Sequence, residues 1–432
     1  MTSTRPHVVI IGSGFAGLAA ARGLGKARAD VTIIDRTNHH LFQPLLYQVA
    51  TAELAPGDIA QPIRHILRRH RNVRVLLGEA TGIDPQTRRV WMGESFLHYD
   101  YLIIATGSRH SYFGNDAWAR FAPGLKTIDD ARRIRARVLA AFEQAEFCHD
   151  TAERTRLLRF VVIGGGPTGV EIAGALAELA RHTLREEFRI INPAMAKIVL
   201  VEAGERILAQ FPHALTAYAE QALARLGVHV LTRTRVTDIN SEGVMLDGAL
   251  LPAATVIWGA GVMATPVGQW LGVETDRLGR VTVDRDFSVP GLDGVYVLGD
   301  AALATLPDGT VLPGLAQVAD QEGEWLGRAL ARRINGEPPS APFHYRDKGN
   351  LATIGRNAAV ADFRRFTLRG FIAWLVWGIV HVYLLNGFDN RMIVTFRWLW
   401  AYATRRRGAR LVSLSQPEVA VVPECRAPLR EE

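Results

Sequence analysis

Two glycine-rich loops of one type lie about 150 residues apart, and each could bind a dinucleotide. Both have G-x-G-x-x-G spacing, and both follow a short apolar run typical of a buried β-strand. In this motif the first glycine permits a tight turn, the second lets a pyrophosphate approach the backbone, and the third packs a helix against the strand. The diphosphate would lie at the free N–H groups of that helix. The glycines are Gly12, Gly14 and Gly17 in the first loop and Gly164, Gly166 and Gly169 in the second.

An acidic residue ends the apolar run that follows each loop. Asp35 ends residues 31–35 and could accept a hydrogen bond from a ribose 2′-OH. Glu202 ends residues 198–202 and favours NADH over NADPH, because a carboxylate repels a 2′-phosphate and no arginine directly follows it. Arg206, four residues further on, leaves NADPH open. Strand, loop, helix and acid together predict two dinucleotide sites, and a purely structural glycine turn is the weaker alternative for each.

A third turn indicates which dinucleotide the first loop binds. The β run that starts at Val295 ends in Gly299 and Asp300. An aspartate at such a strand end can accept a hydrogen bond from a ribityl hydroxyl, which is typical of flavoproteins. A plain turn aspartate is the alternative. The Ala-Thr-Gly turn at 105–107 is also typical of a strand that passes close to a bound dinucleotide. The first loop is therefore predicted to bind FAD and the second to bind NADH.

No cysteine lies in residues 38–48, where disulfide reductases of this kind place one near the flavin. This argues against disulfide reductases and sulfide:quinone reductases. The two cysteines, Cys148 and Cys425, form no CxxC pair and indicate a reducing, cytoplasmic setting. His39 and His40 have no Cys, Asp or Glu at ligand spacing, so we expect no metal site.

Four further residues could take part in chemistry. Glu171 follows the second loop, where it is either an ordinary acid at a helix N-terminus or a member of a proton path. Gln317 and Gln321 share one helix face and could meet a flavin edge and a carbonyl-bearing acceptor, although such pairs are common on exposed helices. Lys348 is either a solvated lysine or a charge near the flavin.

The elements that must position these residues are those of an α/β protein. At 432 residues the chain is long enough for two or three domains. Helices are predicted over 128–149, 172–184 and 324–334, with a helical insert around 181–196. The fold class is two Rossmann-like dinucleotide-binding domains, for FAD and NAD, with the second inserted in the first, followed by a C-terminal helical membrane-anchoring region.

The C-terminal region differs in composition from the rest. Residues 346–432 hold 14 Arg/Lys, 7 Asp/Glu and four of the nine tryptophans, whereas the remaining chain is neutral overall. Residues 370–388 carry no formal charge, and a second apolar segment, 392–402, precedes Arg405–Arg407. A basic, Trp-rich and apolar tail favours a membrane surface over nucleic acid. We expect two helices lying in the interface, ahead of a spanning helix or a soluble hairpin.

Together these stretches resemble the type II NADH dehydrogenases, the single-subunit NADH:quinone oxidoreductases, from Val8 to about Leu414. The most specific motifs are LFQPLLYQ at 41–48, the paired glycine loops, AQ-x-A-x-Q at 316–321, and DKG at 347–349 through Gly355-Arg356. The resemblance implies noncovalent FAD, NADH as substrate, a C-terminal membrane platform whose tunnel admits quinone, and a homodimer. One residue departs from the family pattern, since Glu322 stands where a glutamine is usual beside the tunnel, which leaves the quinone open.

The predicted sites follow from the motifs and this resemblance. FAD is expected to bind to Gly12, Gly14, Phe15, Ala16, Gly17, Asp35, Arg36, Gln43, Ala80, Thr106, Gly107, Gly299, Asp300, Ala316 and Gln317. NADH is expected to bind to Gly164, Gly166, Thr168, Gly169, Val170, Glu171, Glu202 and Gly261. The expected catalytic residues are Glu171, Gln317, Gln321 and Lys348. The expected domains are FAD-binding 1–118 and 265–345, NADH-binding 119–264, and membrane-associating 346–432.

The predicted function is transfer of hydride from NADH to FAD and then reduction of a membrane quinone, without proton pumping. The predicted location is peripheral, on the cytoplasmic face of the cell membrane. Two alternatives stay open. One is a soluble NADH oxidase or ferredoxin-type reductase of the same fold, neither of which needs the apolar tail. The other is a flavin-based redox sensor, which NADH would bleach but which would reduce no quinone.

Overall fold

The computed structural model describes residues 5–385, 387–404 and 408–412. Asn386, the Arg405–Arg407 cluster, Cys425 and the end of the predicted tail domain lie outside this range. The chain divides into two compact units, each made of three segments. The first unit contains residues 1–41, 60–110 and 262–348, and the second contains 42–59, 111–261 and 349–432.

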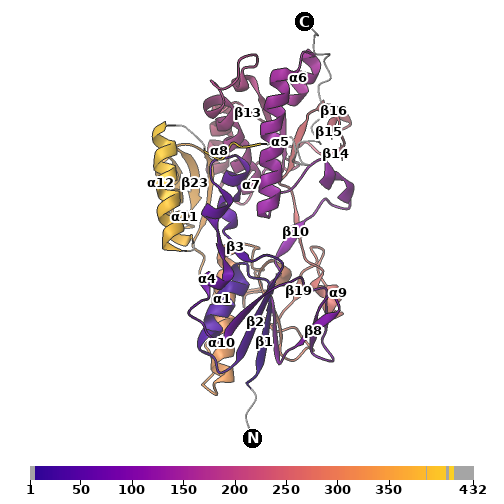
Figure 1. The fold of residues 1–432 in the computed structure, drawn as a ribbon, viewed down its shortest axis with the longest axis vertical. Coiled ribbons are helices and arrows are strands. Elements are labelled where there is room, and N and C mark those ends of the chain that lie inside the picture. The colour runs from indigo at the N-terminus through magenta and orange to yellow at the C-terminus, as the bar shows by residue number, and fades with distance from the viewer. Residues whose placement is uncertain (1–4, 386, 405–407, 413–432) are drawn as a thin grey trace. The chain divides into compact units, whose positions relative to one another are not determined.

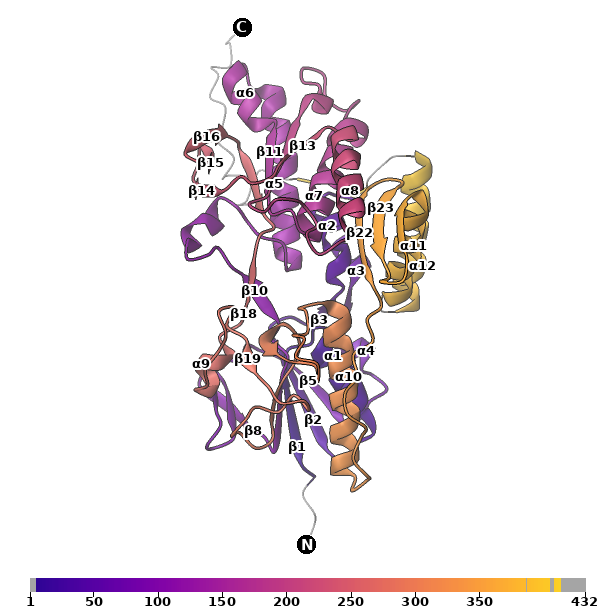
Figure 2. The same ribbon diagram turned by 180° about the vertical axis from the view of Figure 1, so that it is seen from behind.

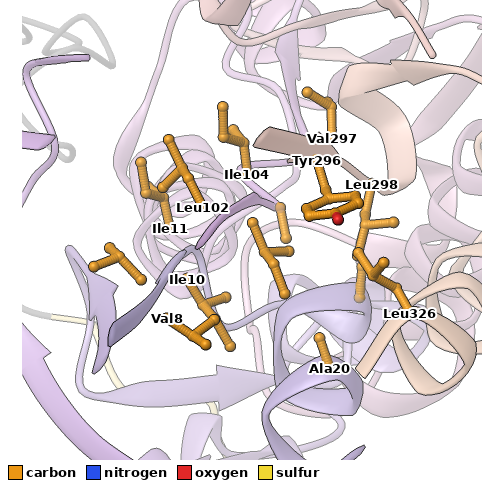
Figure 3. Packing of buried hydrophobic residues seen from close by; sticks show 14 of the residues in the cluster. Val8, Ile10, Ile11, Ala20, Leu102, Ile104, Tyr296, Val297, Leu298 and Leu326 are labelled. Atoms are coloured by element: carbon orange, nitrogen blue, oxygen red, sulfur yellow. The ribbon is translucent and has the colours of Figure 1, made fainter. Parts of the chain in front are cut away.

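The first unit is built on a parallel five-stranded sheet in the order β20-β9-β1-β2-β5, of which β1 and β2 are labelled in Figure 1. The strands are β1 (His7–Ile11), β2 (Asp30–Asp35), β5 (Val73–Leu77), β9 (Tyr101–Ile104) and β20 (Val295–Val297). Nearly every residue of β1 and β9 is buried, as expected for a parallel sheet covered on both faces. Figure 3 shows the packed side chains of this core, among them Val8, Ile10, Leu102, Ile104, Tyr296 and Leu326.

Two helices, α1 (Phe15–Gly23) and α10 (Ala316–Ile334), pack closely against each other in this unit. A Cβ on Gly323 would lie 2.1 Å from the carbonyl oxygen of Ala16, so the approach requires glycine. Helix α10 begins eight residues before the predicted start of 324, which places Gln317 and Gln321 inside it. The remaining elements of the unit are β3 (His39–Leu41), β4 (Ala60–Pro62), α4 (Ile63–Ile66), β6 (Gly82–Asp84), β7 (Arg89–Met92), β8 (Ser95–His98), β10 (Ser108–His110), β18 (Val262–Ala264), α9 (Val267–Leu271), β19 (Val281–Thr282), η6 (Gly299–Ala301) and β21 (Ala302–Leu303).

The second unit contains a parallel sheet in the order β13-β12-β11-β17. Its strands are β11 (Arg159–Ile163), β12 (Lys197–Val201), β13 (Val228–Leu231) and β17 (Thr255–Trp258), and its helices are α2 (Leu46–Ala50), α3 (Pro56–Ile59), α5 (Ile128–Phe147), α6 (Thr151–Leu157), α7 (Pro167–Glu178) and α8 (His213–Arg225). An antiparallel sheet of β14 (Val236–Ile239), β15 (Gly243–Leu246) and β16 (Ala249–Pro252) adjoins them. Each of the two parallel sheets has a strand, β1 or β11, that leads into a glycine loop. This confirms the predicted fold class of two Rossmann-like domains.

The C-terminal part of the second unit is a sheet and two helices rather than helices alone. Strands β22 (Asn350–Gly355), β23 (Ala358–Asp362) and β24 (Thr367–Gly370) form an antiparallel sheet, on which α11 (Phe371–Leu384) packs beside α12 (Phe388–Thr404) (Figure 2). Strand β22 also contacts α7, where a Cβ on Gly174 would lie 1.7 Å from the carbonyl oxygen of Ile354. Neither α11, α12 nor any other described helix combines the length and the apolar character that spanning a membrane requires.

One expectation about local structure is wrong. Residues 181–196 are not a helical insert, because α7 continues only into the π-helical turn η4 (Leu179–Thr183) and a 3₁₀ turn, η5 (Pro193–Met195), follows later. Cys148 is completely buried, whereas Cys425 lies outside the described residues, so the prediction of a reducing setting stays a prediction. The domain boundaries assigned by cofactor stay a prediction.

Candidate functional site

The first glycine loop connects β1 to α1 in the geometry that a diphosphate needs. Gly12 has a positive φ of 93°, and a Cβ there would lie 2.4 Å from the carbonyl oxygen of Ala105. A Cβ on Gly14 would meet nothing within 4 Å, so the chain leaves open space beside this glycine. No side chain caps the N-terminus of α1. An uncapped helix N-terminus of this kind favours an anion through its backbone N–H groups.

Asp35 is held by the chain itself at the end of β2. Its Oδ2 accepts hydrogen bonds from both the N–H and the hydroxyl of Ser13, each at 2.7 Å. Its Oδ1 accepts from the N–H and hydroxyl of Thr37, at 2.7 and 2.8 Å. The carboxylate thus fixes the loop residue between Gly12 and Gly14. A bond to ribose stays a prediction and would have to share these oxygens.

A buried imidazole beside the first loop lacks one hydrogen-bond partner. Nδ1 of His40 lies 2.9 Å from the carbonyl oxygen of Ser13, to which it donates, and the ring meets Phe15 edge-on. Burial lowers the pKa of His40, so the ring is neutral and its Nε2 is an acceptor. Nε2 is buried and has no donor among the residues that the structure describes. Sequence reasoning took His40 for a turn residue and missed this contact.

Asp300 lies in the turn η6, as the motif predicted. Its Oδ2 accepts a hydrogen bond of 2.5 Å from the hydroxyl of Ser108. Nearby in this unit the hydroxyls of Thr106 and Thr265 lie 2.6 Å apart. A flavin dinucleotide fits the donors, acceptors and open space of this unit. These are the open space beside Gly14, the uncapped N-terminus of α1, the Nε2 of His40 that has no donor among the described residues, and the Asp300 carboxylate.

Glu322 is a buried acid of α10. Its side chain is 2% exposed, and its Oε2 accepts a 2.6 Å hydrogen bond from the N–H of Gly299 at the start of η6. Burial first, and then the charge of Asp300, raise the pKa of Glu322 to about 7, although the hydrogen bond opposes the shift. Glu322 thus supports the turn that carries Asp300, and its place beside a quinone tunnel stays a prediction.

Gln317 and Gln321 both bind the backbone of the segment that follows α10. The amide of Gln321 donates to the carbonyl of Arg346 at 2.9 Å and accepts from its N–H at 3.0 Å. Gln317 accepts from the N–H of Lys348 at 3.0 Å. The positive charge of Lys348 lowers the pKa of Asp320, but burial of that carboxyl outweighs it and the net shift is upward. The structure thus brings the two glutamines and Lys348 together, while their roles toward flavin or quinone stay predictions.

The second glycine loop, between β11 and α7, has the same design as the first. Gly164 has a φ of 106°, and a Cβ on Gly166 would meet nothing within 4 Å. No side chain caps α7. Glu202, at the end of β12, accepts a hydrogen bond of 2.6 Å from the N–H of Gly165 through Oε2 and another of 2.6 Å from the N–H of Gly204 through Oε1.

The other predicted cofactor residues fall on the same loops and strand ends. Arg36 is exposed after β2, and Ala80 is buried after β5. Gln43 lies in the second unit, where its amide donates to the carbonyl of Lys126 at 3.4 Å. Thr168 and Val170 lie in the first turn of α7 beside Gly169. Gly261 follows β17 with a φ of 82°, and a Cβ there would lie 2.6 Å from the ring of Phe113.

A large cavity of about 890 Å³ lies within the second unit. It is formed by α2, by one face of α7 with η4, by the end of β22, and by α11 and α12. Aromatic and aliphatic side chains of the two C-terminal helices cover much of its wall. Its ionisable or charged side chains are Tyr47, Glu53, Glu171, Glu178, His182, Arg356, Tyr383, Arg391 and Tyr402. A cavity of this size and character fits a small planar organic molecule with a polar group.

Glu171 is a partly buried acid that lines this cavity. It is the fifth residue of α7 and lies beyond the first turn, so a favourable helix dipole does not account for it. Burial raises the pKa of Glu171 to about 8, against a weak hydrogen bond of 3.4 Å from the N–H of Thr353. At neutral pH the carboxyl is therefore protonated and can donate a proton, which favours the second of the two readings made from the sequence.

A hydrogen-bonded chain of side chains joins α2 to α12 along the cavity wall. The indole N–H of Trp398 donates to Oε1 of Gln48 at 2.9 Å, and the amide of Gln48 donates to the hydroxyl of Tyr47 at 3.0 Å. Trp398 stacks on Trp377 at 5.4 Å, and Trp377 stacks on His381 at 4.4 Å. Sequence reasoning assigned no role to Tyr47 or Gln48, although both belong to the LFQPLLYQ motif that it singled out.

The outer surface of α11 and α12 is strongly apolar. Large side chains that are at least 44% exposed are Phe371, Ile372, Leu375, Ile379, Tyr383, Leu384, Met392, Ile393, Phe396, Leu399 and Trp400. Arg397, on the same helix, is paired with the buried carboxylate of Asp58 at 2.9 Å. A patch of this kind on a folded protein marks an interaction surface.

Comparison with protein families agrees with this division of the chain. Residues 6–323 match the pyridine nucleotide-disulphide oxidoreductase family, and residues 348–407 match the NDH2 C-terminal domain. The first match covers both glycine loops and Asp300. The second covers β22 to α12, including the apolar helices.

Individual relatives are similar over nearly the whole chain. The type II NADH:quinone oxidoreductases NdhA and Ndh of Mycobacterium tuberculosis are each 44% identical over 94% of this chain, and over 88% and 89% of their own length. Among solved structures, NDH2 from Plasmodium falciparum in complex with NADH superposes with a TM-score of 0.85 at 22% identity, covering 94% of this chain and 99% of that one. The sulfide:quinone oxidoreductase of Aquifex aeolicus gives 0.70 at 19% identity, covering 89% and 91%. These two structural likenesses concern the fold.

Proposed function

Because the chain belongs to the family of type II NADH:quinone oxidoreductases, we propose that it oxidises NADH, passes the electrons through FAD and reduces a membrane quinone without pumping protons. The overall reaction is NADH + H⁺ + quinone → NAD⁺ + quinol. One proton per turnover must come from the medium, because the hydride carries two electrons and only one proton. The observation that carries the proposal is the cavity in which the acid Glu171 meets the apolar C-terminal helices.

The two glycine loops are proposed to bind different dinucleotides. The first loop, with Asp300 and the Nε2 acceptor of His40, holds FAD. When bound, the flavin would accept hydride from NADH and pass its two electrons to quinone. The second loop holds NADH on the N-terminus of α7. Glu202 is fixed by two backbone N–H groups and excludes the 2′-phosphate of NADPH by charge.

The cavity between α7 and the C-terminal helices is proposed to receive the quinone head group. Trp374, Trp377 and Trp398 line it and offer flat apolar surfaces to a quinone ring. Glu171 is protonated below pH 8, so it can transfer its proton to a quinone oxygen as negative charge develops there. Burial of this acid in an apolar cavity keeps the proton in place until quinone arrives.

The apolar face of α11 and α12 is proposed to lie in the membrane surface, on the cytoplasmic side. Its exposed aromatic residues suit the headgroup region, and burial of the aliphatic ones removes apolar area from water. This arrangement gives a long-tailed quinone a route from the lipid to the cavity without a membrane span. A homodimer remains a further prediction.

The test uses the full-length flavoprotein with NADH and two electron acceptors. Ferricyanide takes electrons without needing a delivered proton, whereas quinone needs one. Glu171→Gln should keep the bound flavin, and should lower kcat with quinone on the order of 100-fold more than kcat with ferricyanide. Equal quinone rates in the parent and Glu171→Gln would overturn the assignment of the cavity. A parent that consumes NADH with ferricyanide but reduces no quinone of any chain length would overturn the function.

A further inference from the structure

One face of α7 carries a line of ionisable residues that leads from the buried acid to the protein surface. Four residues follow one another at intervals of four, three and four positions, and all of them line the cavity: Glu171, Ala175, Glu178 and His182. Residues at this spacing lie above one another on a helix. Ala175 has no polar atom in its side chain, so it leaves room between the two carboxyls.

The outer end of this line is open to water. Glu171 is partly buried, Glu178 is partly buried, and His182 is exposed. His182 lies in the π-helical turn η4, where the helix widens by one residue. Such turns occur often at functional sites, and here the turn keeps His182 on the cavity face of α7 after the regular helix has ended.

Tyr47 of α2 connects the two carboxyls electrostatically. Burial, and then the charges of Glu171, Glu53 and Glu178, raise the pKa of Tyr47 well above its ordinary value. Its hydroxyl is therefore protonated, and the amide of Gln48 donates to it at 3.0 Å, so the hydroxyl proton points away from Gln48. Tyr47, Glu171 and Glu178 line the same cavity, and a hydroxyl that both accepts and donates can pass a proton between carboxyls through water molecules.

Glu178 is held in place by the C-terminal sheet. Its Oε1 accepts a hydrogen bond from the N–H of Arg356, and a Cβ on Gly355 would lie 2.8 Å from the same oxygen. The guanidinium of Arg356 stacks over the ring of Tyr402 at 3.9 Å and donates to its carbonyl at 2.6 Å. The other charged groups on the cavity wall are Glu53 beside α2 and Arg391 on α12.

We propose that His182, Glu178 and Tyr47 form a proton relay that reloads Glu171 from solvent during quinone reduction. This inference rests on the proposed function. In each turnover the O–H bond of Glu171 breaks and an O–H bond of the quinol forms, while the two electrons come from NADH. The Glu171 carboxylate then takes a proton that passes from water to His182, to Glu178 and through the Tyr47 hydroxyl. The relay supplies the single proton that the overall reaction consumes.

Along α7, Glu171 and Glu178 are separated by about 10 Å at 1.5 Å per residue, so direct transfer between the carboxyls is too long. The cavity volume of about 890 Å³ leaves space for water molecules beside the Tyr47 hydroxyl. Water with polar partners on several sides is well held in such a site. The relay therefore consists of side chains with water in the gaps, and it works only while the cavity stays open to His182.

The experiment compares Glu178→Gln, His182→Gln and Tyr47→Phe in the full-length flavoprotein. Glu178→Gln retains an oxygen to accept from Arg356, so its fold should be preserved. Each variant should keep its flavin and its ferricyanide rate. With quinone, kcat at pH 8 should fall on the order of 10- to 100-fold, while KM changes little. The defect should shrink toward pH 6, where protons are more abundant, and a larger solvent deuterium isotope effect should appear. Added imidazole should restore part of the rate of His182→Gln.

The matched control is Glu186→Gln, an exposed glutamate a few residues beyond His182 that does not line the cavity. Its pH profile should equal that of the parent. If Glu171→Gln is defective with quinone while Glu178→Gln and His182→Gln match the parent at every pH, the relay is wrong and the proposed function stands. If Glu171→Gln itself reduces quinone normally, both proposals fail.

Discussion

Oε2 of Glu202 accepts a hydrogen bond from the N–H of Gly165 at 2.6 Å, so the acid at the end of β12 fixes the middle of the second glycine loop. Its other oxygen is fixed by the N–H of Gly204 at the same distance. Asp35 makes the equivalent bond to Ser13 in the first loop. In both loops the acid that is expected to meet a ribose also shapes the turn that is expected to meet the diphosphate.

This double role predicts the effect of Glu202→Gln. The amide retains one acceptor oxygen but loses the charge and one of the two backbone contacts. We expect KM for NADH to rise about 10-fold and the preference for NADH over NADPH to fall by a similar factor, because a single charge-assisted hydrogen bond contributes about 1.5–3 kcal/mol. Steady-state kinetics with both nucleotides and ferricyanide measure this.

The control for Glu202→Gln is Glu205→Gln, an exposed acid nearby that pairs only with Arg233 among the ion pairs of the described chain. It should leave both KM values within experimental error. An unchanged nucleotide preference in Glu202→Gln would contradict the assignment of Glu202.

Glu322→Gln should remove a pH dependence from the first unit. The folded pKa of Glu322, about 7, lies above the ordinary value of 4.5. The stability that its protonated form contributes is therefore complete below about pH 4.5 and is lost as pH rises through about 7. The glutamine of the variant still accepts a hydrogen bond from the N–H of Gly299, and it never becomes a buried charge. Its melting temperature should exceed that of the parent by about 2–4 °C at pH 8.5 and equal it at pH 4.5.

The same substitution should also change flavin binding. Ionised Glu322 and Asp300 repel each other across the turn η6, which presents Asp300. FAD affinity of the parent, measured by flavin fluorescence after dilution, should weaken between pH 6 and 8, and that of Glu322→Gln should stay constant. Parallel pH profiles for the two proteins would show that Glu322 does not titrate in this range.

Membrane binding should depend on the apolar face of α11 and α12. Ile372 and Ile393 are 62% and 44% exposed and do not line the cavity. The double variant Ile372→Asp, Ile393→Asp should bind lipid vesicles at least 10-fold more weakly in co-sedimentation, since each isoleucine contributes about 1.5–3 kcal/mol when buried. Its ferricyanide activity should not change.

The matched control is Ile190→Asp, an isoleucine that is also 62% exposed but lies far from these helices in sequence. It should bind vesicles as the parent does. Equal loss of binding in the control would show that general surface charge, and not this face, governs association.

Trp398→Phe should lower the stability with which α12 packs on the rest of the second unit. The ring can still stack on Trp377, but Oε1 of Gln48 loses its donor inside the cavity wall. An unsatisfied buried acceptor costs about 1–3 kcal/mol. We expect a lower melting temperature, faster amide exchange in α12 and a several-fold higher KM for quinone. Trp400→Phe, at a 56% exposed position, is the control and should change stability by less than about 0.5 kcal/mol.

Much of the fold could be predicted because the glycine loops are fixed by local chemistry. The first glycine of each loop, Gly12 or Gly164, needs a positive φ, and the third must let helix and strand approach. These demands lie within about ten residues, so the sequence shows them directly. The same holds for Asp300, which follows its strand without a break.

The residues that line the cavity could not be predicted, because they come from distant parts of the chain. Gln48 and Trp398 are 350 positions apart, and no periodicity in either segment indicates that they meet. The target of Glu322 was missed for a related reason. In the sequence motif, Glu322 directly follows Gln321. In the folded helix, its carboxylate accepts a hydrogen bond from the N–H of Gly299, 23 residues earlier. Burial, which decides the protonation of Glu171, is likewise a property of the packed fold.

The chain passes between the two units five times, at residues 41/42, 59/60, 110/111, 261/262 and 348/349. The shortest excursion, 42–59, leaves and re-enters the first unit through paired strands in which Leu41 lies opposite Ala60. Neither unit therefore corresponds to a continuous stretch of gene. No single recombination point could exchange one dinucleotide module for another, so new nucleotide or acceptor preferences in this lineage must arise by substitution within the interleaved segments.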